Sequence, residues 1–351
     1  MTDADPATAP PPPVVPARDA ATIMLVRDAT ADTGPALEVC MLRRHLDSDF
    51  VGGAYVFPGG KVDDEDRTVA AEEACARRSD AEASAMLGVP SGGLAFWVAA
   101  LRECFEEAGV LLAYRGDGVG DDATLVAANP AARDRLAAMR ATLNAGEVRF
   151  LDACRHAGLR LATDRVHYFS HWITPEPAPK RYDTRFFVAA LPPGQEPIHD
   201  DYETVATVWV RPDEALARAA AGEFDLIFPT MKNLEAISRF TTSGELLAAA
   251  AAVERVPTVL PRVVSDERGF RILLPGDPGY DEAVGAGAAT SEAGRSLSPS
   301  EVGAIVRTVG ADGRADRAQP AGPAGAESTG SGTGTGPGGP ADVAPPAGPG
   351  G

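Results

Sequence analysis

Short apolar runs separated by turn-forming residues open the folded part of the chain. Residues 22–26 and 37–43 are each rich in branched and long apolar side chains, as is typical of buried strands. Turn formers fill 28–35 between them, so the two runs are predicted to form a hairpin-like pair. A third short strand, 54–57, runs directly into Pro58-Gly59-Gly60, where the chain must turn.

Helical spacing replaces the strand pattern in the middle of the chain. Apolar residues from Phe96 to Phe105 recur at helical spacing, which predicts a helix over 96–108 that ends at Gly109. Further helices are predicted at 69–78, 131–141, 146–157, 212–221 and 230–240. Further strands are predicted at 166–172, 184–190 and 205–210, and two strand-like pieces follow at 256–264 and 270–274. The order is irregular, which favours an α+β fold in which a mixed sheet lies between helices (α/β/α) over a doubly wound parallel sheet.

Both ends of the chain are low in complexity. Residues 1–17 are rich in Pro and Ala, and 283–351 consist largely of Gly, Ala, Pro, Ser and Thr. Such segments bury too little apolar surface to offset the entropy of ordering, so we expect both to be disordered and the tail to be dispensable. The folded domain is then 18–280, with helical character expected in 67–95 and 121–165.

Composition narrows the class of protein. The chain has 351 residues, of which 44% are hydrophobic, and its formal net charge is −18. A charge of that sign repels nucleic acid and anionic membranes, so neither is an expected partner. No apolar run approaches the roughly 20 residues of a membrane-spanning helix. Four scattered cysteines form no CxxC pair, which favours a reduced, cytoplasmic protein without a zinc site. The sequence does not indicate the oligomeric state.

Three carboxylates on one predicted helix carry the chemistry. Glu103, Glu106 and Glu107 are three and four residues apart, so they can share one helix face. Like charges so placed repel one another unless a cation neutralises them. Mg²⁺ and Mn²⁺ prefer oxygen ligands and bind through a few carboxylates together with substrate phosphates. The alternative is a solvated acidic face with Arg102 as its counter-ion.

The residues upstream of this helix favour the metal site. Gly59-Gly60 feeds an acidic loop, 63–66, and glycines let the backbone approach a metal cluster closely. Together these segments resemble the Nudix box, G-x5-E-x7-R-E-U-x-E-E-x-G-U, in which U is apolar. Five residues separate Gly60 from Asp66 at the first acidic position, and residues 102–110 match the second half of the box, with Cys104 as U.

Two departures from the box are visible. Asp66 stands where the box has Glu, although Glu65 is adjacent, and 35 residues replace the stretch of seven, an insertion of 28. A branch of the Nudix family, the CoA and acyl-CoA diphosphatases, carries an insertion at this place. The stretches His171-Trp172-Ile173-Thr174-Pro175 and 180–187 are also similar to that branch, and the resemblance covers most of 20–240.

The resemblance implies a Nudix hydrolase that cleaves a small-molecule diphosphate with Mg²⁺ or Mn²⁺. Glu103 and Glu107 would be the principal metal ligands and Glu106 a third ligand or the base, which together form the catalytic set. Gly60 could add its backbone carbonyl, while Arg102 and Gly109 would be structural. Water would attack one phosphorus while the metal polarises the phosphate oxygens.

The branch implies CoA or acyl-CoA as substrate, cut to 3′,5′-ADP and 4′-phosphopantetheine or its acyl form. Two alternatives stay open: an ADP-ribose or NADH pyrophosphatase, and a catalytically silent Nudix-fold regulator that binds a nucleotide. The intact carboxylate set argues against the regulator, because a pure binder has no need of clustered like charges. The NADH-cleaving signature S-Q-P-W-P-F is absent.

Cationic residues could contact the substrate phosphates. CoA carries a 3′-phosphate that ADP-ribose lacks, so Arg43 or Arg44 is expected to supply an additional contact away from the metal. Lys61 and Arg181 are further candidates. Because Arg181 and Arg185 flank Tyr182-Asp183, a structural Arg–Asp pair is favoured there over a ligand contact. One of five loop carboxylates could be the general base, and the sequence does not choose among them: Glu176, Glu196, Asp200, Asp201 and Glu203.

Overall fold

The computed structural model describes residues 14–29, 36–48, 52–116, 130–176, 178–266 and 269–283. These residues all belong to the first of two units, Met1–Arg314; the second, Ala315–Gly351, lies outside the described residues. Most of the expected terminal segments, and the turn between the first two predicted strands, also fall outside them.

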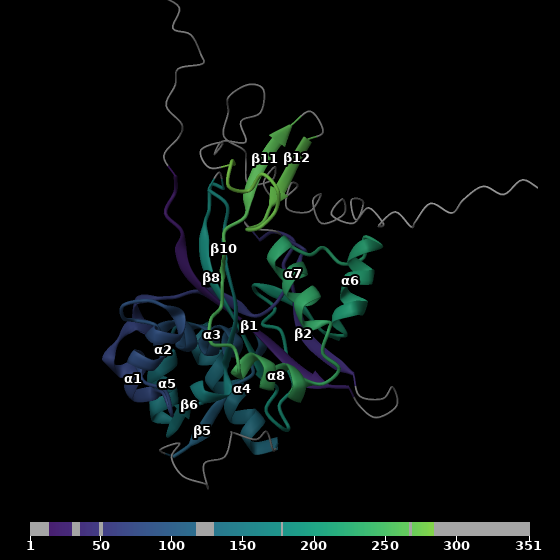
Figure 1. Ribbon diagram of the computed structural model, residues 1–351. Coiled ribbons are helices and arrows are strands. Elements are labelled where there is room, and N and C mark those ends of the chain that lie inside the picture. Colours follow the sequence, from purple (N-terminus) through teal and green to yellow (C-terminus); the bar gives the residue numbers. More distant parts are fainter. Residues whose placement is uncertain are drawn as a thin grey trace, which may run out of the picture. The chain divides into compact units, whose positions relative to one another are not determined.

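A mixed sheet of eight strands occupies the centre of the fold (Figure 1). Its strands are β1 (Arg18–Asp28), β2 (Leu37–Arg44), β3 (Tyr55–Val56), β4 (Gly59–Lys61), β7 (His167–Ile173), β8 (Tyr182–Ala190), β9 (Thr204–Val210) and β10 (Thr258–Val259). The main order is β10-β7-β8-β1-β2-β3, while β4 pairs with β1 and β9 pairs with β2. Because β1 runs parallel to β8 and antiparallel to β2 and β4, the expected hairpin pair and mixed sheet are both confirmed.

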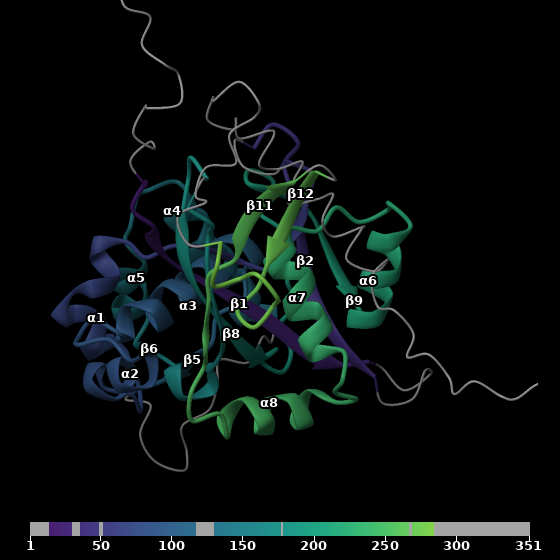
Figure 2. The same ribbon diagram turned by 45° about the horizontal axis from the view of Figure 1, so that its top comes forward.

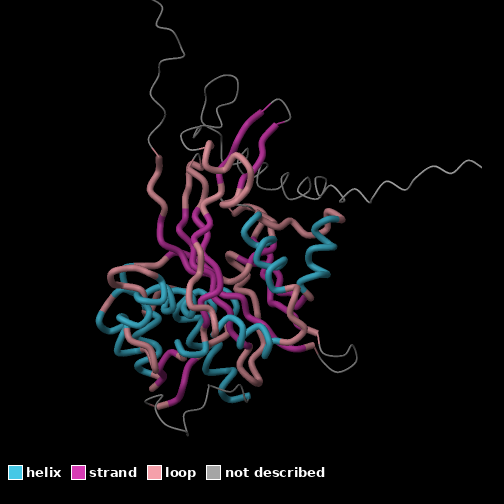
Figure 3. The backbone as a smooth tube through the Cα atoms, viewed as in Figure 1, coloured by secondary structure: helices cyan, strands magenta, loops and turns pink. Residues whose placement is uncertain are grey.

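Helices cover both faces of this sheet (Figures 2 and 3). They are α1 (Val69–Ala74), α2 (Asp80–Leu87), α3 (Leu94–Ala108), α4 (Pro130–Asn144), α5 (Phe150–His156), α6 (Pro212–Ala220), α7 (Phe228–Ile237) and α8 (Ser243–Ala251). Successive residues of β1 point to opposite faces. Ile23 and Leu25 pack in one core with α3, whereas Met24 and Val26 pack in a second core with α7 and α8. The α/β/α arrangement predicted from the sequence is therefore observed.

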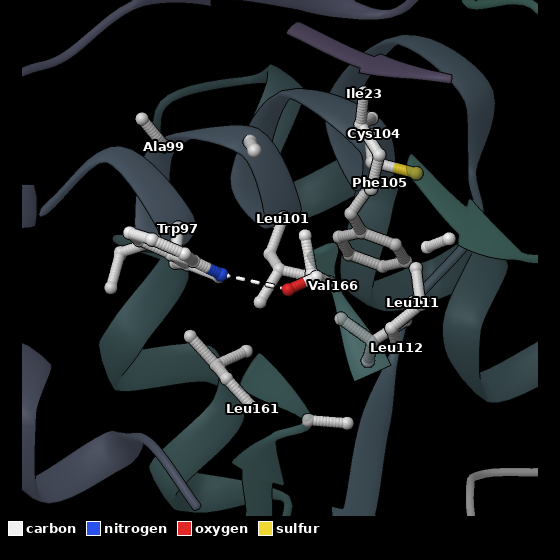
Figure 4. Packing of buried hydrophobic residues seen from close by; sticks show 14 of the residues in the cluster. Ile23, Trp97, Ala99, Leu101, Cys104, Phe105, Leu111, Leu112, Leu161 and Val166 are labelled. Carbon is white, nitrogen blue, oxygen red and sulfur yellow. Dashed lines mark hydrogen bonds between the residues drawn. The ribbon is translucent and has the colours of Figure 1, made fainter. Parts of the chain in front are cut away.

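The long helix α3 is buried almost throughout its length. Trp97 donates from Nε1 to the carbonyl of Val166 at 2.9 Å, and Phe105 lies near Leu111 and Leu112 in the same core (Figure 4). Gly109 ends the helix in the left-handed conformation, with φ of 68°, which an L side chain adopts only with strain. The predicted helix end is correct, and the helix begins two residues earlier than expected.

The insertion in the box is helical, as expected, but the segment 121–165 is only partly so. Residues 121–129 lie outside the described residues, and α4 and α5 account for the helical part. Leu159–Leu161 instead forms β6, which pairs with β5 (Ala113–Arg115), and a 3₁₀ turn, η4 (Thr163–Arg165), follows. A helical interpretation of these residues was wrong because their backbone bonds to a strand more than 40 residues away in the sequence, a partner that no local pattern reveals.

The C-terminal part adds one helix that the apolar pattern did not predict. α8 opens with a capping box, in which Thr242 accepts from Glu245 N and the Glu245 carboxylate accepts from Thr242 N. The loosely placed strand-like pieces become β10 on the edge of the main sheet and a separate two-stranded sheet of β11 (Arg262–Asp266) and β12 (Gly269–Leu273).

Candidate active site

The Gly-Gly turn lies directly against the carboxylates of α3. Gly59 donates its N–H to Glu107 Oε2 at 2.8 Å. A Cβ on Gly60 would lie 2.2 Å from Glu103 Oε1, and one on Gly59 would lie 2.7 Å from the carbonyl of Ala21. A side chain at Gly59 would therefore displace the backbone of β1, and one at Gly60 would push the Glu103 carboxylate out of its present position, so both glycines allow the backbone to approach its neighbours closely.

The two halves of the interrupted box meet through a buried ion pair. Arg102 donates from Nε to Asp66 Oδ1 at 3.2 Å and from Nη2 to Asp66 Oδ2 at 3.0 Å. Asp66 is 2% exposed and Arg102 is 8% exposed. Glu65 points elsewhere and pairs with Arg149 near the surface, at 3.0 Å. Asp66 thus occupies the first acidic position of the box, despite its shorter side chain.

The same guanidinium also holds two box glutamates. Arg102 Nη1 donates to Glu103 Oε1 at 2.9 Å and to Glu106 Oε2 at 3.0 Å, and Nη2 donates to the Lys61 carbonyl at 2.9 Å. Burial alone would lower the pKa of Arg102, but its hydrogen bonds to Asp66 and the charge of Glu103 raise it above the ordinary value. Arg102 therefore stays cationic and fixes the rotamers of the carboxylates around it.

Burial destabilises the charged form of all three glutamates, and neighbouring carboxylates add to this effect. Burial, and after it the charges of Glu106 and Glu203, raise the pKa of Glu103 to about 7 against the opposing effect of Arg102. Burial, then the charge of Glu103, raises the pKa of Glu107 well above its usual range. Burial also raises the pKa of Glu106. Such clusters of perturbed carboxyls are typical of functional sites.

Arg140 of α4 holds the end of the box helix, a contact that the sequence did not suggest. Its Nη2 donates to the carbonyls of Glu106 and Glu107 at 2.8 Å each, and its Nε donates to Glu106 O at 2.9 Å. Asn144 adds a bond to Glu106 O at 3.3 Å. These last-turn carbonyls have no partner within the helix, so Arg140 both satisfies them and fixes the backbone of the two glutamates.

The structure separates the two arginines at the end of β2. Arg43 is exposed, donates to Gly53 O at 3.4 Å and lies over the ring of Tyr55. The positive charge of Arg44 instead acts on Glu107, where it opposes the rise in pKa that burial and Glu103 cause. Its buried Nε donates to no partner in the described part of the chain. Of the two arginines, Arg44 is therefore the one whose charge acts on the box carboxylates.

Among the five loop carboxylates, Glu203 is electrostatically coupled to the box. Its charge raises the pKa of both Glu103 and Glu107. The continuation of the β2–β9 pairing brings it there, because His45 N donates to Glu203 O at 2.9 Å just beyond the Arg44–Thr204 pair. Asp200 instead accepts backbone N–H groups of its own loop.

The remaining cationic candidates lie differently. Lys61 is exposed on β4 and contributes its carbonyl to Arg102. Arg181 is 8% exposed and donates to the carbonyls of Thr174, at 3.0 Å, and Val15, at 2.7 Å. These contacts favour a structural role for Arg181 over a phosphate contact.

A second polar cluster lies on β7 and β8, in the stretches that resemble the CoA-cleaving branch. Asp183 is hydrogen-bonded to His171 Nε2 and paired with Arg185, and Thr258 Oγ1 lies 2.9 Å from His171 Nδ1. Burial alone would raise the pKa of Asp183, but the bonds from His171 and Arg185 hold it below its ordinary value. The structural Arg–Asp pair favoured by the sequence is thus formed by Arg185.

The box carboxylates offer the oxygen donors that a hard divalent cation prefers. Within the described ranges, no three side chains of His, Cys, Asp or Glu converge as a ready-made metal site. Arg102 draws Glu103 Oε1 and Glu106 Oε2 to itself. The donors are nevertheless all oxygens, and the pKa values of Glu103 and Glu107 are raised by burial and then by neighbouring carboxylates, effects that a bound cation would offset.

Comparison with known proteins shows which sequences and structures this chain resembles. The family described as the NUDT19 Nudix domain matches residues 70–237 of this chain. The Gallus gallus protein named acyl-coenzyme A diphosphatase NUDT19 is 30% identical over 304 residues, which are 76% of this chain and 80% of that protein. The Homo sapiens protein of the same name is 28% identical over 275 residues, 69% of this chain and 72% of that protein. A solved Nudix hydrolase from Alicyclobacillus acidocaldarius is 26% identical, covers 66% of this chain and 96% of its own, and has a TM-score of 0.49.

Proposed function

The chain belongs to the Nudix hydrolase family, in the NUDT19 branch, and on that premise we propose that it hydrolyses the diphosphate of CoA or acyl-CoA. The products would be 3′,5′-ADP and 4′-phosphopantetheine or its acyl derivative. The observation that carries this proposal is the pair of Glu103 and the buried Glu107 against Gly59-Gly60, in a chain whose relatives are named acyl-CoA diphosphatases.

The residues of the site then divide into those that would hold the metal and those that orient them. Glu103, Glu107 and Glu106, with the Gly60 carbonyl, would hold Mg²⁺ or Mn²⁺. A bound divalent cation polarises the phosphate oxygens and lowers the pKa of the attacking water. Arg102 orients the carboxylates from the protein side, so their geometry is set before substrate arrives.

Two carboxylates outside the Glu103–Glu107 pair could take the proton of the attacking water. Glu106 Oε2 is held by Arg102 at 3.0 Å, which favours a fixed, charged role. The Glu203 carboxylate makes no side-chain hydrogen bond or ion pair in the described part of the chain, and its charge acts on both members of the pair. We therefore favour Glu203 as the general base, with Arg44 binding a substrate phosphate.

The expected partners and location follow from helix hydropathy, the state of the cysteines and the net charge. In the described residues no helix has the length and hydropathy that crossing a membrane requires. Cys40, Cys75, Cys104 and Cys154 are all buried as free thiols, which supports the reducing, cytoplasmic location that we infer. The charge of −18 supports a small-molecule substrate over nucleic acid.

The decisive experiment is a screen of diphosphate compounds with Mg²⁺ or Mn²⁺, with products identified by mass. We expect CoA and acyl-CoA to yield 3′,5′-ADP. Faster turnover of ADP-ribose or NADH would support the alternative pyrophosphatase, and binding without turnover of any compound would support the silent regulator.

Glu107→Gln tests the site itself. The amide oxygen can still accept from Gly59 N, so the fold should survive, while turnover at saturating Mg²⁺ should fall by about 100-fold or more. Glu73→Gln makes the same chemical change at an exposed position of α1 and should leave turnover intact. Near-normal turnover in Glu107→Gln would remove the box from the mechanism.

A further inference from the structure

The most exposed large apolar side chains gather on two loops. Three of the four most exposed in the described residues are Tyr202, at 80%, Leu46, at 70%, and Ile198, at 62%. Leu46 follows β2, whereas Ile198 and Tyr202 precede β9. Apolar side chains in water gain nothing for folding, so a concentration of them calls for a ligand or a partner.

The backbone brings these three residues to the edge of the proposed active site. His45 N donates to Glu203 O at 2.9 Å, which places their neighbours Leu46 and Tyr202 at the same end of the β2–β9 pair. Ile198 N donates to the carbonyl of Ala108, the last residue of α3, at 2.9 Å. We call Leu46, Ile198 and Tyr202 the apolar lip. Glu203 follows Tyr202 directly, and its charge acts on Glu103 and Glu107 of the box.

The loop that presents Tyr202 is built rather than slack. Asp200 Oδ1 accepts from the backbone N–H groups of Tyr202 at 3.3 Å, Glu203 at 3.2 Å and Thr204 at 2.9 Å. Asp201 between them has φ of 65°, a left-handed conformation that is uncommon for a residue with a side chain. These three hydrogen bonds fix the backbone on both sides of Tyr202, so an ordered loop presents the exposed ring.

We propose that the apolar lip binds the pantetheine arm of the substrate; this inference rests on the proposed hydrolysis of CoA. The arm begins with a branched aliphatic pantoyl unit bonded to the diphosphate. When the diphosphate is bound at the box carboxylates, this unit must therefore contact residues at the edge of the box. The three side chains of the lip carry no charge, so they offer a phosphate neither an ion pair nor, apart from the Tyr202 hydroxyl, a hydrogen-bond donor. Two aliphatic side chains and one tyrosine suit an aliphatic arm better than adenine, which favours stacking between flat groups.

Inhibition by the two products tests the proposal. In Tyr202→Ala and Leu46→Ala the inhibition constant of 4′-phosphopantetheine against CoA cleavage should rise about tenfold. The inhibition constant of 3′,5′-ADP should stay within about twofold. Val253→Ala, another exposed apolar residue but one distant in sequence from both loops, should change neither value.

A rise confined to 3′,5′-ADP would place adenine on the lip and overturn the proposal, as would no change for either product. Calorimetric binding of 4′-phosphopantetheine to wild type and Tyr202→Ala repeats the test without turnover. If wild type does not cleave CoA, the proposed function fails. If it cleaves CoA but both variants bind 4′-phosphopantetheine as tightly as wild type, only the lip assignment fails.

Discussion

Replacing Asp66 by alanine should uncouple the two halves of the interrupted box. The change removes two hydrogen bonds to Arg102, of 3.2 and 3.0 Å, and the bond that Asp63 N donates to Asp66 Oδ2 at 2.9 Å. It leaves a buried guanidinium without its most buried counter-ion. The insertion between the halves then has one anchor fewer.

The magnitude follows from what Arg102 retains. Removing one partner of a buried ion pair costs roughly 3–5 kcal/mol. Arg102 keeps its contacts with Asp63, Glu103, Glu106 and the Lys61 carbonyl. We therefore expect the lower end, a loss of about 3 kcal/mol of the free energy of unfolding. For a domain of this size that corresponds to a Tm lower by roughly 6–12 °C.

Urea unfolding followed by tryptophan fluorescence measures this loss, and Mg²⁺-dependent turnover measures its effect on the site. Turnover should fall about 10- to 100-fold, because Arg102 would move freely against the carboxylates that it positions. Asp64→Ala, an exposed neighbour in the same 3₁₀ turn, η3 (Asp64–Arg67), should behave like wild type. An unfolding free energy of Asp66→Ala within about 0.5 kcal/mol of wild type would refute the idea that this pair closes the box.

Three further changes probe the surroundings of the site. Arg140→Ala should lower kcat and Tm together, since the last carbonyls of α3 lose their donor; an unchanged kcat would show that the helix end needs no support. Arg44→Ala should reduce the kcat/KM preference for CoA over 3′-dephospho-CoA by about 1–3 kcal/mol, and an unaltered preference would exclude a contact with the 3′-phosphate. Asp183→Asn should lower Tm at pH 7. Because the pKa of folded Asp183 is depressed, the difference from wild type should persist down to about pH 4 and shrink as the pH falls further, and a constant difference down to pH 2 would contradict the assignment.

Local pattern predicted the elements whose signal is local. The buried apolar runs of β1 and β2, and the periodic face of α3 with Gly109 at its end, gave the correct element types and nearly the correct bounds. The strand β6 was missed because three residues carry no decisive period and their pairing partner is distant. The helix α8 was missed although Thr242 and Glu245 form a capping box, a signal that its nearly uniform alanine run obscured.

The candidate site divides in the same way. The box carboxylates and the two glycines were predicted from motif and spacing, because the insertion separates the two halves of the box but leaves the spacing within each half intact. Arg140 could not be predicted, since one arginine on an exposed-looking helix resembles any other until α4 packs against the end of α3. Glu203 was one of five equivalent loop acids until the β2–β9 register brought it toward the box.

The interruption of the box is tolerated because the inserted helices have anchors of their own. Thr163 Oγ1 donates to the carbonyl of Ala76 at 2.7 Å, and Arg78 donates from both Nε and Nη2 to Thr163 O at 3.2 Å. These bonds fix the residues just after α1 to η4, which follows α3 in the sequence. Arg102 fixes Asp66, which precedes the insertion. Closing a loop of 35 residues costs only about 1.4 kcal/mol more than closing one of seven, since the entropic term grows with the logarithm of length. The buried Asp66–Arg102 contact exceeds that cost, and the bonds from Arg102 to the Lys61 carbonyl and from Gly59 to Glu107 add to it, so the two halves of the box stay in register despite the insertion.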